Sequence, residues 1–431
     1  MRKKLILCLL CLGIALLGVS FICTPVTAAP PKGDPINFGL ITAIDAPWGK
    51  TNKISMEIAV NEINEAGGIL GRPVKLLIED WKRQVPLAVA AYRKLVISDK
   101  CLFVFTEGSE GVMALQQEAV RLFSEYPHIQ IGNYTAADKV TDVVKDEYEK
   151  YKFFFRPFPR AGNAYDPNFN VWSVLNDIGT KKLALVVEDT AFTSKLISGV
   201  PGRFPPIKDW IEKRAPGVKV VAIHQNSGTE TMFLPLLELI ARSGADTMFL
   251  LGAYTNHATF ANQWADSSAK NIDVISWSGV SAYAKFWDMT RGSGLGWISQ
   301  FPEVEIPYTD KTLPFLKKLR EAGGGLMGST YAAYDGPWIA KAAIEKVGNT
   351  KDVLAMIKAV EQGEVQHGFW KWAFDERHDP VMGYPYYPWT FAQHQGPGKY
   401  PLVYPPELVK TANPDDKIIR IRDLRKMMKK K

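Results

Sequence analysis

The chain has 431 residues, of which 46% are hydrophobic and 23% charged, so it can bury the cores of two ordinary domains and is not a disordered chain. Its net charge of +7 comes from residues 417–431, which hold eight Lys or Arg and one acid, Asp423. The rest of the chain is balanced in charge, which argues against a nucleic-acid-binding face, so no nucleic acid is expected as a partner.

Residues 411–431 are interpreted as a basic C-terminal tail. The clustered charges and few apolar residues predict a frayed, solvated helix. The alternative is a weak contact with anionic lipid head groups, because Met427 and Met428 stand beside the last lysines.

The first residues have the composition of a secretory signal peptide. Basic residues at positions 2–4 precede an apolar stretch, residues 5–23, and small residues follow at 26–28. We therefore expect residues 1–28 to be removed after Ala28, which would place the mature protein in the periplasm.

This segment has two alternative interpretations. The apolar stretch is nearly long enough for an N-terminal membrane anchor. A lipoprotein cut at Cys23 is disfavoured, because bulky Phe21 and Ile22 stand where small residues are expected. Loss of the signal leaves Cys101 as the only cysteine, so no intramolecular disulfide is possible, and we expect Cys101 to be a buried small hydrophobe.

The first folded unit reads as strand, helix, strand. Apolar and β-branched residues predict strands at Ile36–Thr42 and Val74–Asp80, and Gly67-Gly68 ends the helix between them. Such a unit closes right-handed into a parallel pair, so ligands are expected at the carboxyl end of the first strand. The apolar stripe of the helix, spaced i, i+3, i+4 and i+7, consists of Met56, Ala59, Val60 and Ile63.

A longer stretch carries a resemblance. Residues 61–81, NEINEAGGILGRPVKLLIEDW, resemble the N-terminal signature of the type I periplasmic solute-binding proteins, in the branch that serves branched-chain amino acids, amides, urea and aromatic acids. The resemblance implies an α/β fold with two doubly wound parallel-sheet lobes joined by a three-crossing hinge. It also implies a monomeric receptor of an ABC transporter, without cofactor, that closes on a small organic solute and delivers it to membrane permease subunits.

The expected lobes follow from that resemblance and from the alternation of strands and helices. Lobe 1 is expected to comprise residues 35–157 and 299–368, and lobe 2 residues 158–298 and 369–410. The third crossing is placed at residues 368–375, GFWKWAFD, which resemble the family's late G-x-x-F-D hairpin.

In lobe 1 the resemblance points to loops that follow strands. Trp48 lies in the first loop and Ser109 in the turn after residues 102–106, where its alternative role is an N-cap. The next ligand loop holds Tyr134, Thr135 and Ala136. At the first crossing, Arg156 and Arg160 could pair with a ligand carboxylate, although a structural salt bridge is the alternative.

In lobe 2 the corresponding candidates are Phe192, Tyr254, Trp277 and Ser278. Ser278 matches a position where amino-acid binders of the family commonly carry an acid that holds the ligand's α-ammonium. Either another acid, with Asp189 the nearest by motif, replaces it, or the ligand has no ammonium. We expect a carboxylate or amide with an apolar or aromatic body, its polar end met by Ser109, Thr135 and the amides of the first helix.

Motifs for catalysis are missing from the sequence. The six histidines show no H-x-x-x-H spacing, and neither a G-x-S-x-G elbow nor a Walker loop occurs, so we expect neither an enzyme nor a metal site. The remaining functional alternative is a ligand-sensing regulator on the same fold, because fold alone does not separate transport from sensing.

Overall fold

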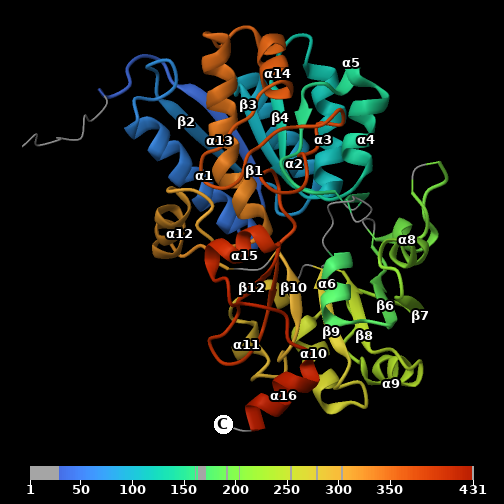
Figure 1. Ribbon diagram of the computed structural model, residues 1–431. Coiled ribbons are helices and arrows are strands. Elements are labelled where there is room, and N and C mark those ends of the chain that lie inside the picture. Colours follow the sequence, from blue (N-terminus) through green and yellow to red (C-terminus); the bar gives the residue numbers. More distant parts are fainter. Residues whose placement is uncertain are drawn as a thin grey trace, which may run out of the picture.

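The computed structural model describes residues 29–160, 162–163, 171–190, 193–202, 204–252, 255–277, 280–301 and 304–429. Figure 1 shows two lobes, one above the other, each built on a sheet with helices packed around it. The expected α/β class with two lobes of mostly parallel sheet is therefore confirmed. The expected signal peptide lies outside the described residues.

The sheet of lobe 1 has five parallel strands in the order β2-β1-β3-β4-β5. The first two strands have the bounds that the sequence predicts, and Ile36 pairs with Val74. β5 runs directly into the first crossing, so the carboxyl ends of all five strands lie on the side of lobe 2. The strands are β1 (Ile36–Thr42), β2 (Val74–Asp80), β3 (Phe103–Glu107), β4 (Ile129–Tyr134) and β5 (Phe154–Phe155).

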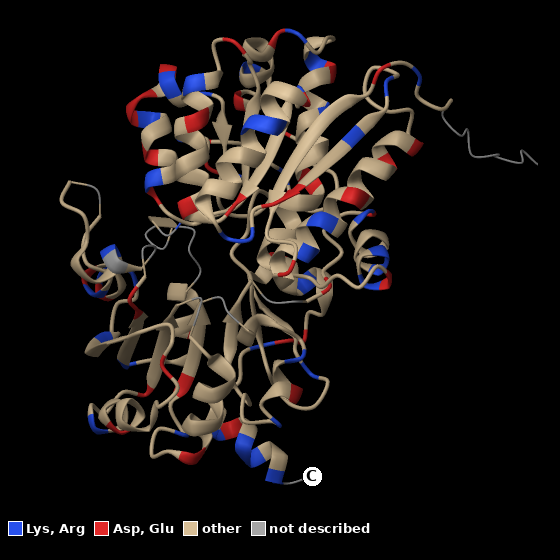
Figure 2. Ribbon diagram, turned by 180° about the vertical axis from the view of Figure 1, so that it is seen from behind, with Lys and Arg blue, Asp and Glu red and all other residues tan. Residues whose placement is uncertain are grey.

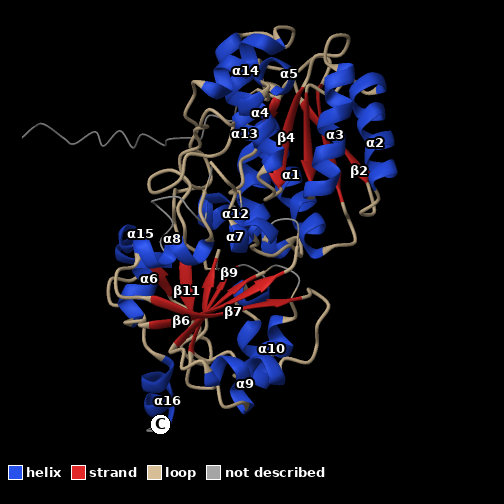
Figure 3. Cartoon of the chain, turned by 90° about the vertical axis from the view of Figure 1, so that its right-hand side faces the viewer, coloured by secondary structure: helices blue, strands red, loops and turns tan. Residues whose placement is uncertain are grey.

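Helices cover both faces of this sheet (Figure 3). The predicted apolar stripe of α1 is buried, and α1 packs against α13, which ends at Gly348 in the left-handed conformation. The helices of lobe 1 are α1 (Pro47–Glu65), α2 (Val85–Arg93) with the π-helical turn η1 (Lys94–Ser98), α3 (Ser109–Leu122), α4 (Lys139–Asp146), α5 (Tyr148–Tyr151), α12 (Thr312–Glu321), α13 (Gly328–Val347) and α14 (Val353–Glu361).

The sheet of lobe 2 has the order β12-β11-β10-β9-β8-β6-β7, in which β11 runs antiparallel to both of its neighbours, β10 and β12. β10 runs into the second crossing, so the carboxyl ends of its parallel neighbours point toward lobe 1. The strands are β6 (Lys182–Glu188), β7 (Lys219–Asn226), β8 (Thr247–Leu251), β9 (Asp273–Trp277), β10 (Ile298–Gln300), β11 (Phe391–Gln393) and β12 (Leu402–Tyr404). The helices are α6 (Val171–Ile178), α7 (Ser194–Ser198), α8 (Ile207–Arg214), α9 (Leu234–Arg242), α10 (His257–Asp266), η3 (Val280–Ala282), α11 (Phe286–Met289), α15 (Pro406–Ala412) and α16 (Ile421–Lys429).

Two lobe boundaries differ from the sequence expectation. β10 belongs to the sheet of lobe 2, so the second crossing follows Gln300 instead of starting at residue 299. The expected third crossing at residues 368–375 packs on lobe 1, because Trp372 pairs with Val365 and its indole Nε1 donates to Asp335 of α13 at 2.8 Å. The chain reaches lobe 2 only at β11, so residues 383–390 form the third crossing.

The expectation of a frayed C-terminal tail is wrong for its described part. α15 and α16 are regular helices. Ile421 and Leu424 of α16 are buried on lobe 2, with exposed fractions of 0% and 2%. Asp273 accepts hydrogen bonds from the Ile421 amide at 2.7 Å and from Arg420 Nε at 2.9 Å. Burying two apolar side chains and pairing one buried carboxylate attaches this segment to lobe 2.

Cys101 is a free, buried cysteine, as expected. Burial raises the pKa of its thiol to about 12, so the thiol is neutral at physiological pH and packs as a small apolar group. Over the part of the chain that the structure covers, every helix is too short or too polar to cross a membrane.

Candidate functional site

A buried carboxylate organises the carboxyl ends of the lobe 1 strands. Glu107 ends β3, its side chain is only 2% exposed, and its two oxygens accept five hydrogen bonds. Five donors saturate a carboxylate, which offers about four lone-pair positions. The donors are Thr42 Oγ1 (2.7 Å) and Asn52 Nδ2 (2.6 Å) on Oε2, and the Ala43 amide (2.8 Å), Trp48 Nε1 (3.2 Å) and Trp81 Nε1 (3.4 Å) on Oε1.

Glu107 connects the first loop to the first turn of α1. A Cβ on Gly49 would lie 1.9 Å from the Ala43 carbonyl oxygen, so only glycine allows the helix to start this close to the loop. Trp48, half-buried in that turn, is oriented by its bond to Glu107. The Ala43 amide, in the loop ahead of α1, is already taken by the protein's own carboxylate, and that the solute meets the amides of the first helix stays a prediction.

The hydroxyl groups of two predicted ligand residues of lobe 1 are within hydrogen-bond distance of each other. Ser109 Oγ lies 3.1 Å from Thr135 Oγ1 and also accepts a hydrogen bond from the Ala137 amide at 3.3 Å. The alternative role of Ser109 as an N-cap is wrong, because Gly108 holds the cap position with φ of 76°. Thr135 is 3% exposed and Ala136 beside it is half-buried. The loops after β3 and β4 thus present paired hydroxyl groups at the edge that faces lobe 2.

A row of aromatic rings crosses from lobe 1 to lobe 2, and we call it the aromatic row. It comprises Tyr134, Phe158, Phe301, Trp389 and Trp277, with successive ring centroids 5.0, 6.3, 5.3 and 6.0 Å apart. Phe158, Phe301 and Trp389 come from the three crossings, so the hinge itself is the centre of this packing. The row joins Tyr134 and Trp277, which the sequence predicts as ligand residues.

Neither Phe158 nor Phe301 was predicted as a site residue. Each is 8% exposed, at the base of the region where the two lobes meet. Trp277 is 6% exposed and packs edge-on against Trp389, so most of its surface contacts protein. Phe158 follows the recognisable F-R motif, and that aromatic signal at a crossing could have identified it.

The first of the two hinge arginines is fully buried. Arg156 NH2 lies 2.6 Å from Asp379 Oδ1, and both side chains are no more than 1% exposed. The same guanidinium donates to the carbonyl oxygens of Thr135 (3.3 Å) and Ala137 (2.9 Å) and to Thr141 Oγ1 (2.6 Å). This geometry favours the structural alternative, in which Arg156 holds the second ligand loop in place.

Arg160 is also paired with carboxylates of the protein. Its side chain is 20% exposed, with NH1 2.9 Å from Asp138 Oδ1 and Nε 3.3 Å from Asp379 Oδ2. Asp138 Oδ1 also accepts from the Gly162 amide at 2.9 Å. These contacts favour a salt bridge over a ligand contact at Arg160 as well.

In lobe 2 the described part of the predicted site lies at the end of β6. Asp189 is exposed, and its amide donates to the Asn226 carbonyl oxygen at 2.9 Å. Glu188, one residue earlier, is buried and accepts from both the amide and the hydroxyl of Thr255, at 2.9 and 2.8 Å. The other predicted residues of this lobe, Phe192, Tyr254 and Ser278, lie outside the described residues.

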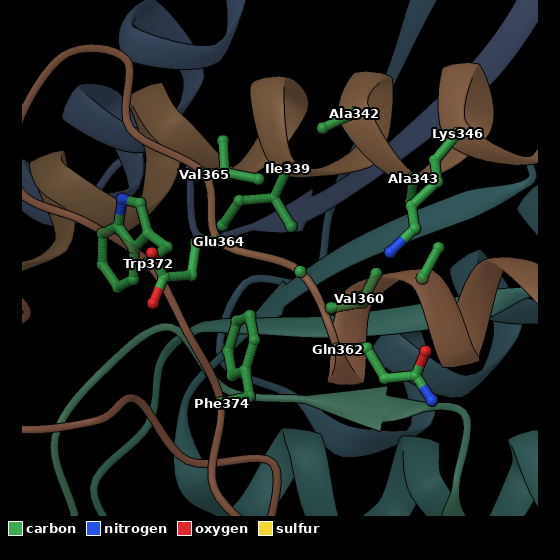
Figure 4. Close-up of a pocket in the computed structure, with 12 residues that line it drawn as sticks. Ile339, Ala342, Ala343, Lys346, Val360, Gln362, Glu364, Val365, Trp372 and Phe374 are labelled. Atoms are coloured by element: carbon green, nitrogen blue, oxygen red, sulfur yellow. The ribbon is translucent and has the colours of Figure 1, made fainter.

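A cavity of about 270 Å³ lies elsewhere on lobe 1 (Figure 4). It opens between α13, α14 and the segment after α14, away from the carboxyl ends of the strands. In folds of this class ligands bind at those strand ends, so we do not assign the solute to this cavity. Its lining includes Ile339, Lys346, Val360, Glu364, Trp372 and Phe374. Within the described part of the chain, His, Cys, Asp and Glu form no group of three or more that could hold a metal ion.

A family model described as periplasmic binding protein matches residues 35–395, which span both lobes and all three crossings. The chain belongs to the periplasmic binding protein family. Membership confirms the resemblance read from residues 61–81. It also agrees with the expectation that the chain is not an enzyme, because this is a family of solute-binding proteins.

The similar proteins named here have low sequence identity to this chain. A Leu/Ile/Val-binding protein homolog 3 from Brucella melitensis is 24% identical over 80% of this chain and 88% of that protein. The crystal structure of a putative branched-chain amino acid ABC transporter from Silicibacter pomeroyi superposes with a TM-score of 0.75 at 16% identity, covering 90% of this chain and 99% of the other. A solute-binding protein of an ABC transporter from R. palustris, in complex with benzoate, gives 0.64 at 17% identity, covering 85% and 95%.

Proposed function

We propose that this periplasmic binding protein is the solute receptor of an ABC importer, which closes its lobes on a small organic solute and presents it to membrane permease subunits. The observation that carries the proposal is the family match across residues 35–395, which includes both lobes and the hinge. The signal-like composition of residues 1–28 supports export to the periplasm. We further propose that the receptor acts as a monomer.

We propose a carboxylate or amide with an apolar or aromatic body as the solute class. The paired hydroxyl groups of Ser109 and Thr135 offer neutral hydrogen bonds to a polar end. Tyr134 of the aromatic row, which packs on Phe158, and Trp48 of the first loop are both half-buried and supply flat apolar surface for the body. The R. palustris protein of the same fold is in complex with benzoate, an aromatic carboxylate, which supports the proposed class.

The same geometry argues against dependence on a free α-ammonium. Glu107 is the carboxylate that ends β3, but its oxygens already accept five hydrogen bonds from the protein. An ammonium would have to displace one of those donors, which would then be left without its acceptor in a buried site. Asp189, which is exposed at the end of β6, is the acid that could serve such a group instead.

A thermal-shift screen tests the receptor function. A solute that binds only the folded state, at a concentration of about a hundred times its Kd, should stabilise the protein by about 2.7 kcal/mol. The screen compares aromatic and aliphatic carboxylates, amides and amino acids with sugars and nucleosides as controls. We expect stabilisation by one or more carboxylates or amides. Stabilisation by sugars or nucleosides alone would contradict the proposed solute class.

Substitution of Trp48 tests the lobe 1 part of the site. Trp48→Ala is expected to weaken solute binding by more than about 1 kcal/mol with little change in the melting temperature of the solute-free protein, because the ring is half-buried. Trp48→Phe is the control, since it keeps an aromatic face but loses the Nε1 bond to Glu107. Calorimetric affinities equal to wild type for Trp48→Ala would remove Trp48 from the site.

A further inference from the structure

The outer face of α16 carries three exposed basic side chains, Arg422, Lys426 and Lys429, which we call the basic stripe. Their spacing of four and three residues places them on one side of the helix. Asp423 lies 3.0 Å from Lys426 Nζ. Among the residues that the structure describes, Arg422 and Lys429 form no ion pair, and the exposed pair of Lys426 with Asp423 is worth little in water, so all three basic groups are available to a partner.

The stripe belongs to the segment that gives the whole chain its charge. Residues 417–431 contain eight of the 52 Lys and Arg but only one of the 45 Asp and Glu, which leaves 44 of each sign in the other residues. Figure 2 shows basic residues gathered along α16 beside the C-terminus. The positive potential of the protein is therefore concentrated at this one place.

The helix is held firmly on lobe 2. Besides the pairing of Asp273 with Arg420 and Ile421, the side chain of Gln393 bonds to both the amide and the carbonyl group of Ile419, at 2.9 and 2.7 Å. A Cβ on Gly296 would lie 2.8 Å from the Ile421 side chain, so Gly296 allows the helix to dock closely. A surface that is already ordered loses little conformational entropy when it binds.

One exposed apolar side chain follows Lys426 of the stripe. Met427 is 52% exposed, whereas Met428, 39% exposed, has its sulfur near Gly396 of lobe 2. A short helix that offers basic groups together with exposed apolar side chains has the composition of a bilayer-interface contact. α16 lies at the end of lobe 2 that is farthest from lobe 1, so a contact there leaves the region between the lobes open to solute (Figures 1 and 3).

We propose that the basic stripe of α16 docks this protein on an anionic bilayer surface. Lipid phosphate oxygens accept hydrogen bonds from Arg422, Lys426 and Lys429, while Met427 enters the head-group region. The stripe has no aromatic side chain for base stacking, which favours a bilayer over a single-stranded nucleic acid. A receptor that delivers solute to a permease works beside a bilayer, and this last point rests on the proposed function.

The test is sedimentation of the full mature chain with vesicles, without solute, so that its failure is distinct from failure of the receptor function. Vesicles of equal parts phosphatidylglycerol and phosphatidylcholine are compared with phosphatidylcholine alone. Each basic group near an anionic surface strengthens binding about fivefold, so Arg422→Gln/Lys426→Gln/Lys429→Gln should bind about 100-fold more weakly. Binding of the wild type should be lost at about 0.5 M salt.

The matched control is Lys219→Gln/Lys270→Gln/Lys285→Gln, which removes the same charge from three exposed lysines elsewhere on lobe 2. We expect it to bind anionic vesicles as wild type does. Equal binding of wild type to both vesicle types, or an equal loss in the control, would overturn the proposal. Tighter binding to random-sequence duplex DNA than to anionic vesicles at the same salt would overturn it as well.

Discussion

Glu107→Ala is expected to lower the free energy of unfolding by about 3–5 kcal/mol. The substitution leaves the donors of Thr42, Ala43, Asn52 and the two tryptophans without their acceptor in a buried site. Each unsatisfied buried donor costs about 1–3 kcal/mol, and water entering the space left by the side chain offsets part of that sum. Urea denaturation of the solute-free protein measures the change.

Glu110→Ala is the matched control for Glu107→Ala. Glu110 lies three residues later on the exposed side of α3 and carries the same charge. We expect it to change the unfolding free energy by no more than about 0.5 kcal/mol. Glu107→Gln should fall between the two, because the amide keeps one acceptor oxygen but places an NH₂ group among donors. Equal stability of the Glu107→Ala and Glu110→Ala variants would show that Glu107 does not organise lobe 1.

Breaking the buried ion pair at the hinge should have a similarly large effect. Arg156→Met leaves the Asp379 carboxylate buried, with Arg160 and Thr141 as its remaining partners. Loss of one member of a buried pair typically costs about 3–5 kcal/mol, so we expect a decrease in unfolding stability of that size. The carbonyl groups of Thr135 and Ala137 lose a donor as well, so solute affinity should fall with stability.

The control for this pair is Arg121→Met. Arg121 is 71% exposed and bridges Glu118 at 3.3 Å, and without it the buried Glu118 carboxylate keeps its pairing with Arg93 at 2.7 Å. A double-mutant cycle of Arg156→Met with Asp379→Asn separates the pairwise contribution, and we expect a coupling energy above about 1 kcal/mol. An Arg156→Met variant within about 1 kcal/mol of wild type would contradict the structural role assigned to this residue.

The local spacing of apolar residues was sufficient to predict the elements of the first strand-helix-strand unit, residues 36–80. The sequence predicts β1, β2 and the buried stripe of α1 with the bounds that the structure shows, because one face of each element is apolar at a regular spacing. The lobe on which residues 368–375 pack could not be predicted in the same way. The apolar ring of Trp372 could pack on either lobe. The residue that decides between them, Asp335, is 37 residues away in the chain.

Glu107 and the C-terminal helix were missed for a related reason. The donors on Glu107 lie 26 to 65 residues away in the chain, so only the folded structure brings them to one carboxylate. In α16, the buried Ile421 and Leu424 lie three residues apart, but four of the nine residues of this helix are basic, which favours a solvated segment when the sequence is considered alone. The pairing of Ile421 with Asp273 spans 148 residues.

The central claim is that the protein binds an organic carboxylate or amide without needing a free α-ammonium. Calorimetry of matched pairs tests it most directly: 3-phenylpropionate against phenylalanine, and 4-methylpentanoate against leucine. Ser278 stands where the resemblance places the acid that holds an α-ammonium, and Glu107 is saturated by five protein donors, so the acid without an amino group should bind at least as tightly in each pair. Tighter binding of the amino acid in every pair would contradict the claim and show that another acid, with Asp189 the first candidate, holds the ammonium.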